Sequence, residues 1–270
     1  MPALHGLWSG GLIIGSGLGA VLAGAGVGLA DHFLVVMITI TGVNVVVVLG
    51  WVDHRTRPDP STVRRRPASR AITVPVLLLG VMLLFSNVGE GSASDWLALY
   101  AHDERGLGVG PAAAVFTTYT VTSTFGRLVG GFVIDRFGRV GVLRACGVVT
   151  AVGVAATVVV PGPAGLFTGA ALWGLGVAVV FPTAITAAGD HGRDNSAGAI
   201  AAVSTFGYTA MLSGPPLIGL LAQATSIRDS LLLVGVLTLG ITALAGAARV
   251  GRSVEPTTTG RPSVRSQPAL

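Results

Sequence analysis

The chain has 270 residues, of which 51% are hydrophobic and only 11% are charged, and its mean hydropathy is +0.76. A water-soluble domain carries about 25% charged residues, so this composition excludes a soluble globular enzyme and indicates a membrane protein. The net charge of +5 comes from seventeen arginines, with no lysine, against twelve acidic residues. Because these arginines are scattered over loops between apolar runs, they favour anchoring at one membrane face over binding to nucleic acid.

Eight apolar segments are long enough to be transmembrane helices, because about 20 residues at a rise of 1.5 Å cross the hydrocarbon layer. They cover approximately residues 8–29, 33–52, 71–89, 111–134, 141–160, 165–188, 196–224 and 230–248. Only Asp31 and His32 separate the first two segments, which predicts a hairpin that turns at these residues. A cleaved signal peptide is less favoured for the first segment, because no basic residue precedes it. The fold class predicted is all-α, a polytopic membrane bundle of about eight helices.

Two polar segments divide the chain. Residues 53–70 contain six arginines and three prolines, which predicts an extended, solvated linker. Residues 249–270 are rich in Pro, Ser, Thr and Arg, which predicts a disordered tail. The expected organisation is therefore two transmembrane helices in residues 1–52, the linker, a six-helix bundle in residues 71–248, and the tail.

The arginines are distributed unequally over alternate loops. One side receives fourteen of them, the other receives Arg105 and Arg228, and Arg127 falls inside an apolar segment. Basic loops of membrane proteins stay in the cytoplasm, so the linker and the C-terminus are predicted to be cytoplasmic. The protein is expected to be a multi-pass protein of the cell membrane.

The sequence GGFVIDRFGR lies in the turn between two apolar segments on the Arg-rich side. It resembles the signature loop of the major facilitator superfamily (MFS), which is written G-x-x-x-D-R-x-G-R-R/K. The last basic position of that pattern is Val140 in this chain, and Arg144 follows four residues later. The matching residues are Gly131, Asp135, Arg136, Gly138 and Arg139.

The resemblance implies a fold of twelve transmembrane helices in two halves that a basic cytoplasmic linker joins. Residues 71–248 resemble the C-terminal half and residues 1–52 resemble the last two helices of the N-terminal half, so the first four helices have no counterpart in the chain. Residues 90–100 and 214–216 are also similar to the branch that contains fucose-permease-like and drug-efflux-like members.

Two functions remain open at this point. The resemblance implies a secondary transporter that moves a small solute by alternating access, with protons as the expected coupling ion. The alternative is an N-terminally truncated fragment, or a membrane subunit that depends on a partner and has no transport activity of its own. Because no catalytic motif is present and Cys146 is the single cysteine, an enzyme, a cofactor and a metal site are not expected.

The resemblance also implies that the signature loop latches the cytoplasmic side in one conformation and releases it in the other. Asp135 is expected to receive the N–H groups at the start of the following helix or to pair with an arginine of a neighbouring loop. The competing interpretation is a topological anchor, in which the arginines hold the loop inside and Asp135 caps a helix.

Gly126 and Gly130 have the spacing of small residues that lets membrane helices approach closely.

Candidate residues of a proton or solute pathway lie in several segments. If the third segment continues toward Tyr100, Glu90 and Asp95 lie within the membrane, where carboxyl groups can carry the protons that drive transport. If it stops at Gly89, both are ordinary acids of an outer loop. Asn87 precedes Glu90 by one turn.

Four further residues are weighed against simpler interpretations. Arg127 lies about two turns into the bilayer, where an arginine is costly unless it is paired, although its side chain can also extend to the interface. Tyr119 could line a cavity, although the hydroxyl groups around it can bond to carbonyls of their own helix. Trp173 and Tyr208 could line a solute path, but core packing is the favoured interpretation.

Three prolines remove backbone donors within helices and predict kinks. They are Pro182, Pro215 and Pro216.

Overall fold

The computed structural model describes residues 2–51, 72–192 and 195–249, and throughout these ranges the chain forms helices joined by short turns. This confirms the predicted all-α class. The helices are α1 (Pro2–Gly24), α2 (Leu29–Trp51), α3 (Val74–Asp103), α4 (Val109–Phe137), α5 (Arg139–Val159), α6 (Gly162–Val177), α7 (Val180–His191), α8 (Ser196–Ala224), α9 (Ile227–Leu244) and the short 3₁₀ helix η4 (Ala245–Ala248). The predicted linker 53–70 and all but the first residue of the predicted tail 249–270 lie outside the described residues.

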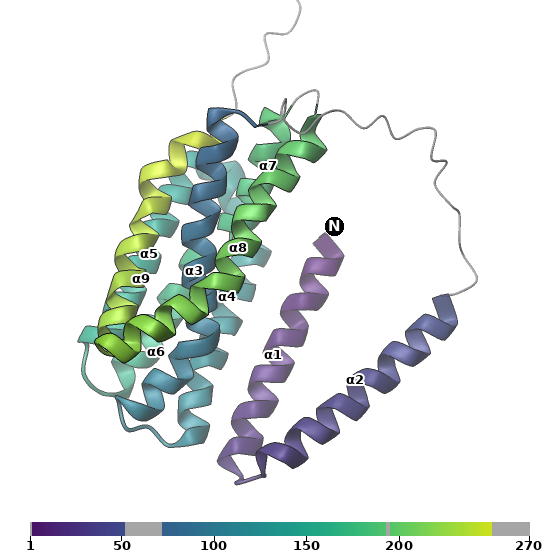
Figure 1. Cartoon of the computed structure of the whole chain (residues 1–270), viewed down its shortest axis with the longest axis vertical. Helices are drawn as coiled ribbons and strands as arrows, with labels where there is room; N and C mark the ends of the chain where they lie inside the picture. Colours follow the sequence, from purple (N-terminus) through teal and green to yellow (C-terminus); the bar gives the residue numbers. More distant parts are fainter. Residues whose placement is uncertain (1, 52–71, 193–194, 250–270) are drawn as a thin grey trace, which may run out of the picture.

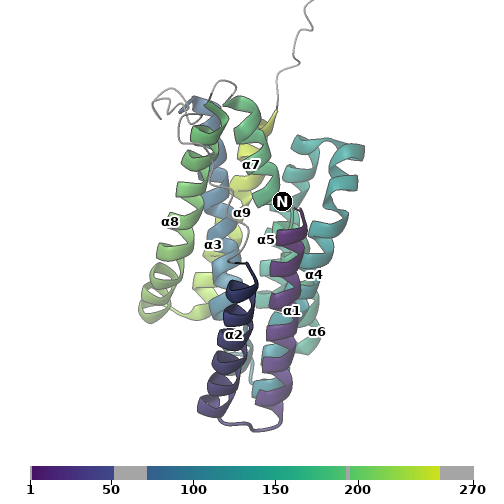
Figure 2. The same cartoon turned by 90° about the vertical axis from the view of Figure 1, so that its right-hand side faces the viewer.

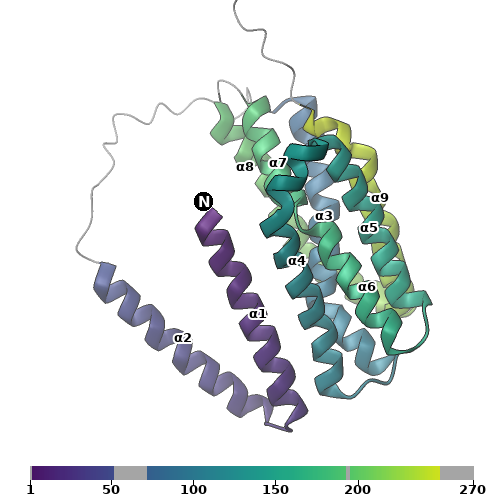
Figure 3. The same ribbon diagram turned by 180° about the vertical axis from the view of Figure 1, so that it is seen from behind.

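Helices α3 to α9 run side by side in one bundle, and the α1–α2 hairpin lies beside it (Figure 1). Within the bundle, α4 packs along α6, α6 along α5, α5 along α9, and α3 along both α9 and α8. Helix α1 packs against α4, as Figures 2 and 3 show from two sides. Helices α3, α4 and α6 therefore each contact several other helices, and side chains at these contacts are shielded from lipid.

Five described helical segments are long and apolar enough to cross a membrane, judged by length and composition. Helices α4 and α8 have 29 residues each and are not among these five, but they lie within the same bundle. The five segments are Leu29–Gly50, Val74–Asp103, Arg139–Val159, Gly162–His191 and Ile227–Ala248.

Helix α2 is the most apolar of these segments, and none of its hydrophobic window is buried within the described structure. Val46 and Leu49, for example, are 71% and 73% exposed. In Figure 1 the helix diverges from the bundle. Exposed apolar surface of this extent is typical of contact with lipid or with other protein.

The turn of the first hairpin lies earlier in the sequence than predicted. It consists of residues 25–28, and Asp31 and His32 belong to the first turns of α2. Gly26 adopts a φ of 74°, a left-handed conformation that glycine adopts without strain. Asp31 instead lies near the helix N-terminus, where a negative charge is favourable. The prediction of a turn at Asp31 and His32 was therefore wrong.

The sixth predicted segment is split into two helices at residues 178–179. Pro182 has no N–H to donate, and its ring clashes with the carbonyl of the residue four positions earlier, Ala178. Directly after the break, the Val179 carbonyl accepts from both the backbone N–H of Thr183 at 3.1 Å and the Thr183 hydroxyl at 2.6 Å. Pro215 and Pro216 lie inside α8, which continues as a helix and bends along its length (Figure 1).

At the end of the bundle opposite the signature loop, Arg105 forms hydrogen bonds with the C-terminal end of α5. The guanidinium of Arg105 donates to the carbonyls of Thr157 at 2.7 Å and Val160 at 2.6 Å, at the C-terminal end of α5. It also lies 5.8 Å from the centre of the Tyr100 ring. The last carbonyls of a helix have no partner within the helix and favour a cation. Arg105 therefore joins the α3–α4 turn to the end of α5.

We expect Arg105→Gln to lower the free energy of unfolding by about 1–3 kcal/mol, because it removes charge-assisted hydrogen bonds to carbonyls that are left without donors. The measurement is thermal unfolding of the purified chain in detergent. Arg228→Gln is the matched control, because it removes an exposed charge at the same end of the bundle. An equal loss of stability in both variants would contradict the assigned role.

Candidate functional site

The signature loop is a turn of one residue between α4 and α5. Gly138 lies between the last residue of α4 and the first residue of α5 and caps both helices. Its φ of 77° and ψ of 149° lie in a region that glycine adopts readily and other residues rarely. The N–H of Gly138 donates to the carbonyl of Ile134 at 2.8 Å. The glycine of the motif at this position therefore allows the chain to reverse without a loop.

The charged residues of the loop are arranged differently from the expectation. Among the described residues no side chain forms a capping hydrogen bond with α5, and Asp135 is exposed. The expectation that Asp135 receives the N–H groups at the start of α5 is therefore wrong for this structure. Arg136 lies over the ring of Phe137 at 5.9 Å. Arg139 forms an ion pair with Asp190, near the end of α7.

Asp190 was missed by the sequence reasoning. The available signal was an acidic residue at the end of the sixth apolar segment, on the side where arginines are concentrated. A shallow pocket of about 590 Å³ lies at this ion pair, between the start of α5, the end of α7 and the end of η4.

The two glycines with small-residue spacing lie against the break between α6 and α7. A Cβ atom on Gly126 would meet the Cβ of Ala178 at 2.6 Å, and one on Gly130 would collide with Val179. Gly131, by contrast, has open space around it. Close packing of α4 against the break thus depends on Gly126 and Gly130.

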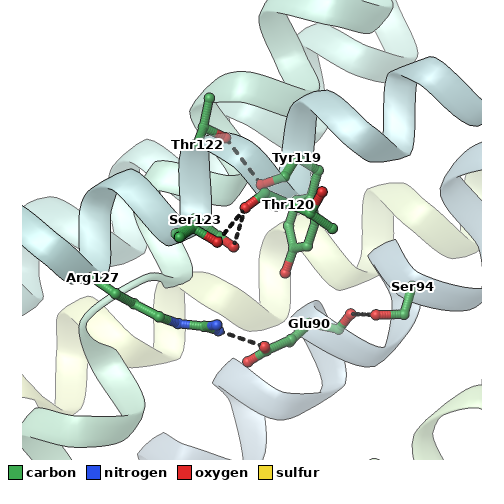
Figure 4. Close-up of polar contacts among 8 residues, drawn as sticks. Glu90, Ser94, Tyr119, Thr120, Thr122, Ser123 and Arg127 are labelled. Carbon is green, nitrogen blue, oxygen red and sulfur yellow. Dashed lines mark hydrogen bonds and ion pairs between the residues drawn. The ribbon is translucent and has the colours of Figure 1, made fainter. Parts of the chain in front are cut away.

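An ion pair lies inside the bundle between α3 and α4. The Nη2 atom of Arg127 is 2.7 Å from Oε1 of Glu90, and the two side chains are 12% and 29% exposed (Figure 4). Helix α3 continues to Asp103, so the third segment does not stop at Gly89 and Glu90 lies within the helix. The structure thereby brings together two residues that the sequence suggested separately.

Two aromatic residues lie beside this ion pair. Tyr119 and Trp173 are 3% and 0% exposed and meet edge to face, with ring centres 6.1 Å apart. Among the described residues, neither the Tyr119 hydroxyl nor the Trp173 indole N–H has a hydrogen-bond partner. Buried polar groups are nearly always paired, so these two donors require an explanation.

The hydroxyl groups of α4 near Tyr119 bond mostly to their own helix. The Thr118 hydroxyl donates to a carbonyl one turn earlier. Thr122 and Ser123 do the same (Figure 4). Thr120 in addition lies 3.1 Å from the hydroxyl of Ser16 on α1. These groups stabilise the helix and its contact with α1, and they leave Tyr119 as the polar residue of this segment without a partner in the described structure.

The other predicted pathway residues have other contacts or are exposed. Asn87 is buried and donates to the Gly207 carbonyl on α8 at 2.9 Å, so it belongs to the α3–α8 contact. Asp95 is exposed on α3, and Tyr208 is 65% exposed on α8. The site that the structure assembles is therefore Glu90, Arg127, Tyr119 and Trp173.

Comparison with known proteins supports the resemblance to the major facilitator superfamily. Residues 108–269 match the family described as Major Facilitator Superfamily. The chain is 30% identical to an uncharacterized transporter of Sinorhizobium fredii, over 91% of this chain and 64% of that protein. It is 30% identical to an uncharacterized MFS-type transporter of Yersinia pestis, over 64% of this chain and 45% of that protein. The chain thus spans less than two thirds of the length of these curated relatives.

A solved structure has the same fold. The chain resembles the crystal structure of the MFS transporter FucP in the outward conformation, with a TM-score of 0.57 and 16% identity, over 82% of this chain and 55% of that one. At this level of identity the likeness concerns the fold alone. The predicted likeness to the major facilitator fold is confirmed, and this family and fold are those of transporters and not of enzymes.

Proposed function

The chain belongs to the Major Facilitator Superfamily, and on this premise we propose that it acts in secondary transport of a small solute across the cell membrane by alternating access. The observation that carries the proposal is the Glu90–Arg127 ion pair inside the helical bundle. Charged groups within membrane segments are costly, and where they occur they mark solute or ion pathways. A pair on two different helices can open when these helices move.

We propose protons as the coupling ion and Glu90 as the group that carries them. Its carboxylate pairs with Arg127 in this structure, and a proton on Glu90 would weaken that pair. The proposed orientation places the signature loop and the C-terminus in the cytoplasm, because most arginines lie at that end.

A second candidate is a membrane subunit that transports only together with further membrane helices. The apolar surface of α2, which is not covered in the described structure, favours it. Reconstitution of the purified chain alone into proteoliposomes separates the two candidates. Solute exchange by the chain alone supports the first, and exchange that requires an added membrane partner supports the second.

The Arg139–Asp190 ion pair is the proposed latch. It links the start of α5 to the end of α7, at the end of the bundle for which we propose a cytoplasmic location. If the pair exists in one conformation only, its loss shifts the conformational equilibrium by its own free energy. Partly exposed pairs contribute up to about 1 kcal/mol.

We expect Arg139→Gln and Asp190→Asn each to change the transport rate by about two- to fivefold, which corresponds to a pair of this strength. Membrane insertion should persist. The exchanged pair, Arg139→Asp with Asp190→Arg, should recover part of the rate, and Arg144→Gln, an exposed charge near the start of the same helix, is the control. Rates equal to the unchanged protein in both single variants would refute the latch.

A further inference from the structure

The site between α3, α4 and α6 contains two buried donors, the Tyr119 hydroxyl and the Trp173 indole N–H, that have no hydrogen-bond partner among the described residues. The guanidinium of Arg127, the hydroxyl of Tyr119 and the indole N–H of Trp173 can all donate, and the Glu90 carboxylate pairs with Arg127. We propose that this site binds the carboxylate group of an organic anion and that Glu90 occupies the place of this group when the anion is absent. The proposal rests on the proposed transport function, because it names the class of solute.

The two unpartnered donors lie close to the ion pair. Tyr119 is on α4, two turns before Arg127, and its hydroxyl points toward the side of α3 that carries Glu90 (Figure 4). The Trp173 indole nitrogen lies 3.8 Å from the position that a Cβ atom of Gly89 would occupy, and Gly89 directly precedes Glu90. Both donors therefore converge on the same short stretch of α3.

An unpaired donor in a low-dielectric interior is costly, and a ligand that supplies acceptor atoms removes this cost. An anion does so best, because hydrogen bonds to a charged acceptor are about twice as strong as neutral ones. The Glu90 carboxylate already fits the guanidinium at 2.7 Å. A ligand carboxylate reproduces this geometry, which favours a carboxylate over a phosphate.

The ion pair is partly exposed, whereas the aromatic residues are covered. Glu90 is 29% exposed and Arg127 is 12% exposed, whereas Tyr119 is 3% exposed. The charged pair therefore forms the exposed edge of the proposed site, and the phenol lies in its covered part.

This arrangement makes Glu90 a competitor of the ligand for Arg127. Glu90→Gln removes the competing charge and keeps the size of the side chain, so it should tighten anion binding about tenfold, as expected when the binding-competent fraction rises. Arg127→Gln should abolish binding. A merely structural ion pair predicts no such opposite effects, because either change would only destabilise the bundle.

The test uses the purified full chain in nanodiscs of neutral lipid. The shift of the thermal unfolding midpoint is measured with millimolar acetate, lactate, benzoate or succinate, each beside its uncharged amide and beside inorganic phosphate. We expect at least one carboxylate to raise the midpoint while its amide does not. The shift should grow in Glu90→Gln, vanish in Arg127→Gln and shrink in Tyr119→Phe.

The double variant Glu90→Gln with Arg127→Gln guards against a folding artefact, because it leaves no uncompensated buried charge. It should keep its unfolding midpoint in the absence of ligand and should not respond to carboxylates. Four outcomes would each overturn the proposal. They are equal shifts with the amides, a response to phosphate alone, no response to any carboxylate, and weaker binding in Glu90→Gln. Transport of an uncharged solute that carboxylates do not inhibit would overturn the proposed solute class but not the proposed transport function. Carboxylate binding without any transport would overturn the transport function but not the binding site.

Discussion

Glu90→Gln is expected to abolish transport that is driven by a pH gradient, while exchange of solute at equal pH on both sides persists. Glutamine has the size of glutamate but cannot take up and release a proton. Glu90 is the carboxyl group that the bundle holds against Arg127, so its loss removes the site where proton binding and opening of the ion pair are linked.

The measurement compares pH-driven uptake with counterflow in proteoliposomes that contain the purified protein. Asp103→Asn is the matched control, because it removes an exposed acid at the end of the same helix. Normal pH-driven uptake by Glu90→Gln would remove Glu90 from the coupling mechanism. Loss of both uptake and counterflow would instead indicate damage to the solute pathway.

Gly153→Ala is expected to destabilise the bundle, although alanine is the better helix former. A Cβ atom on Gly153 would lie 2.8 Å from the Gly169 carbonyl oxygen and would collide with the backbone nitrogen of Trp173. Backbone atoms cannot rotate away, so α5 and α6 must separate. Overpacking of this kind costs about 1–3 kcal/mol, which exceeds the gain in helix propensity of about 1 kcal/mol or less.

The same substitution elsewhere on α5 gives the control. A Cβ atom on Gly141 would meet nothing within 4 Å, so Gly141→Ala should leave the stability unchanged or raise it slightly. Thermal unfolding in detergent and the amount of monodisperse protein after extraction measure both effects. A loss of stability in Gly153→Ala without a loss in Gly141→Ala would support the close approach of α5 and α6. A neutral Gly153→Ala would refute it.

Much of the fold follows from local sequence rules. Apolar runs near the thickness of the hydrocarbon layer predicted the helices, and Pro182 accounts for the break between α6 and α7 through the hydrogen bond that it cannot make. The turn at Asp31 and His32 was predicted wrongly, because polarity was given more weight than the conformational freedom of Gly26. Such rules concern a residue and neighbours within about one helical turn.

The sequence by itself determined that this is a helical membrane protein, and its signature loop indicated the superfamily. It also singled out Glu90 and Arg127, because each charge is costly within an apolar segment. Only the tertiary structure decided the partners. Glu90 and Arg127 are 37 positions apart, and Arg139 and Asp190 are 51 apart. These distances exceed the reach of any helical periodicity, so the pairs exist only because packing brings α3 to α4 and the start of α5 to the end of α7.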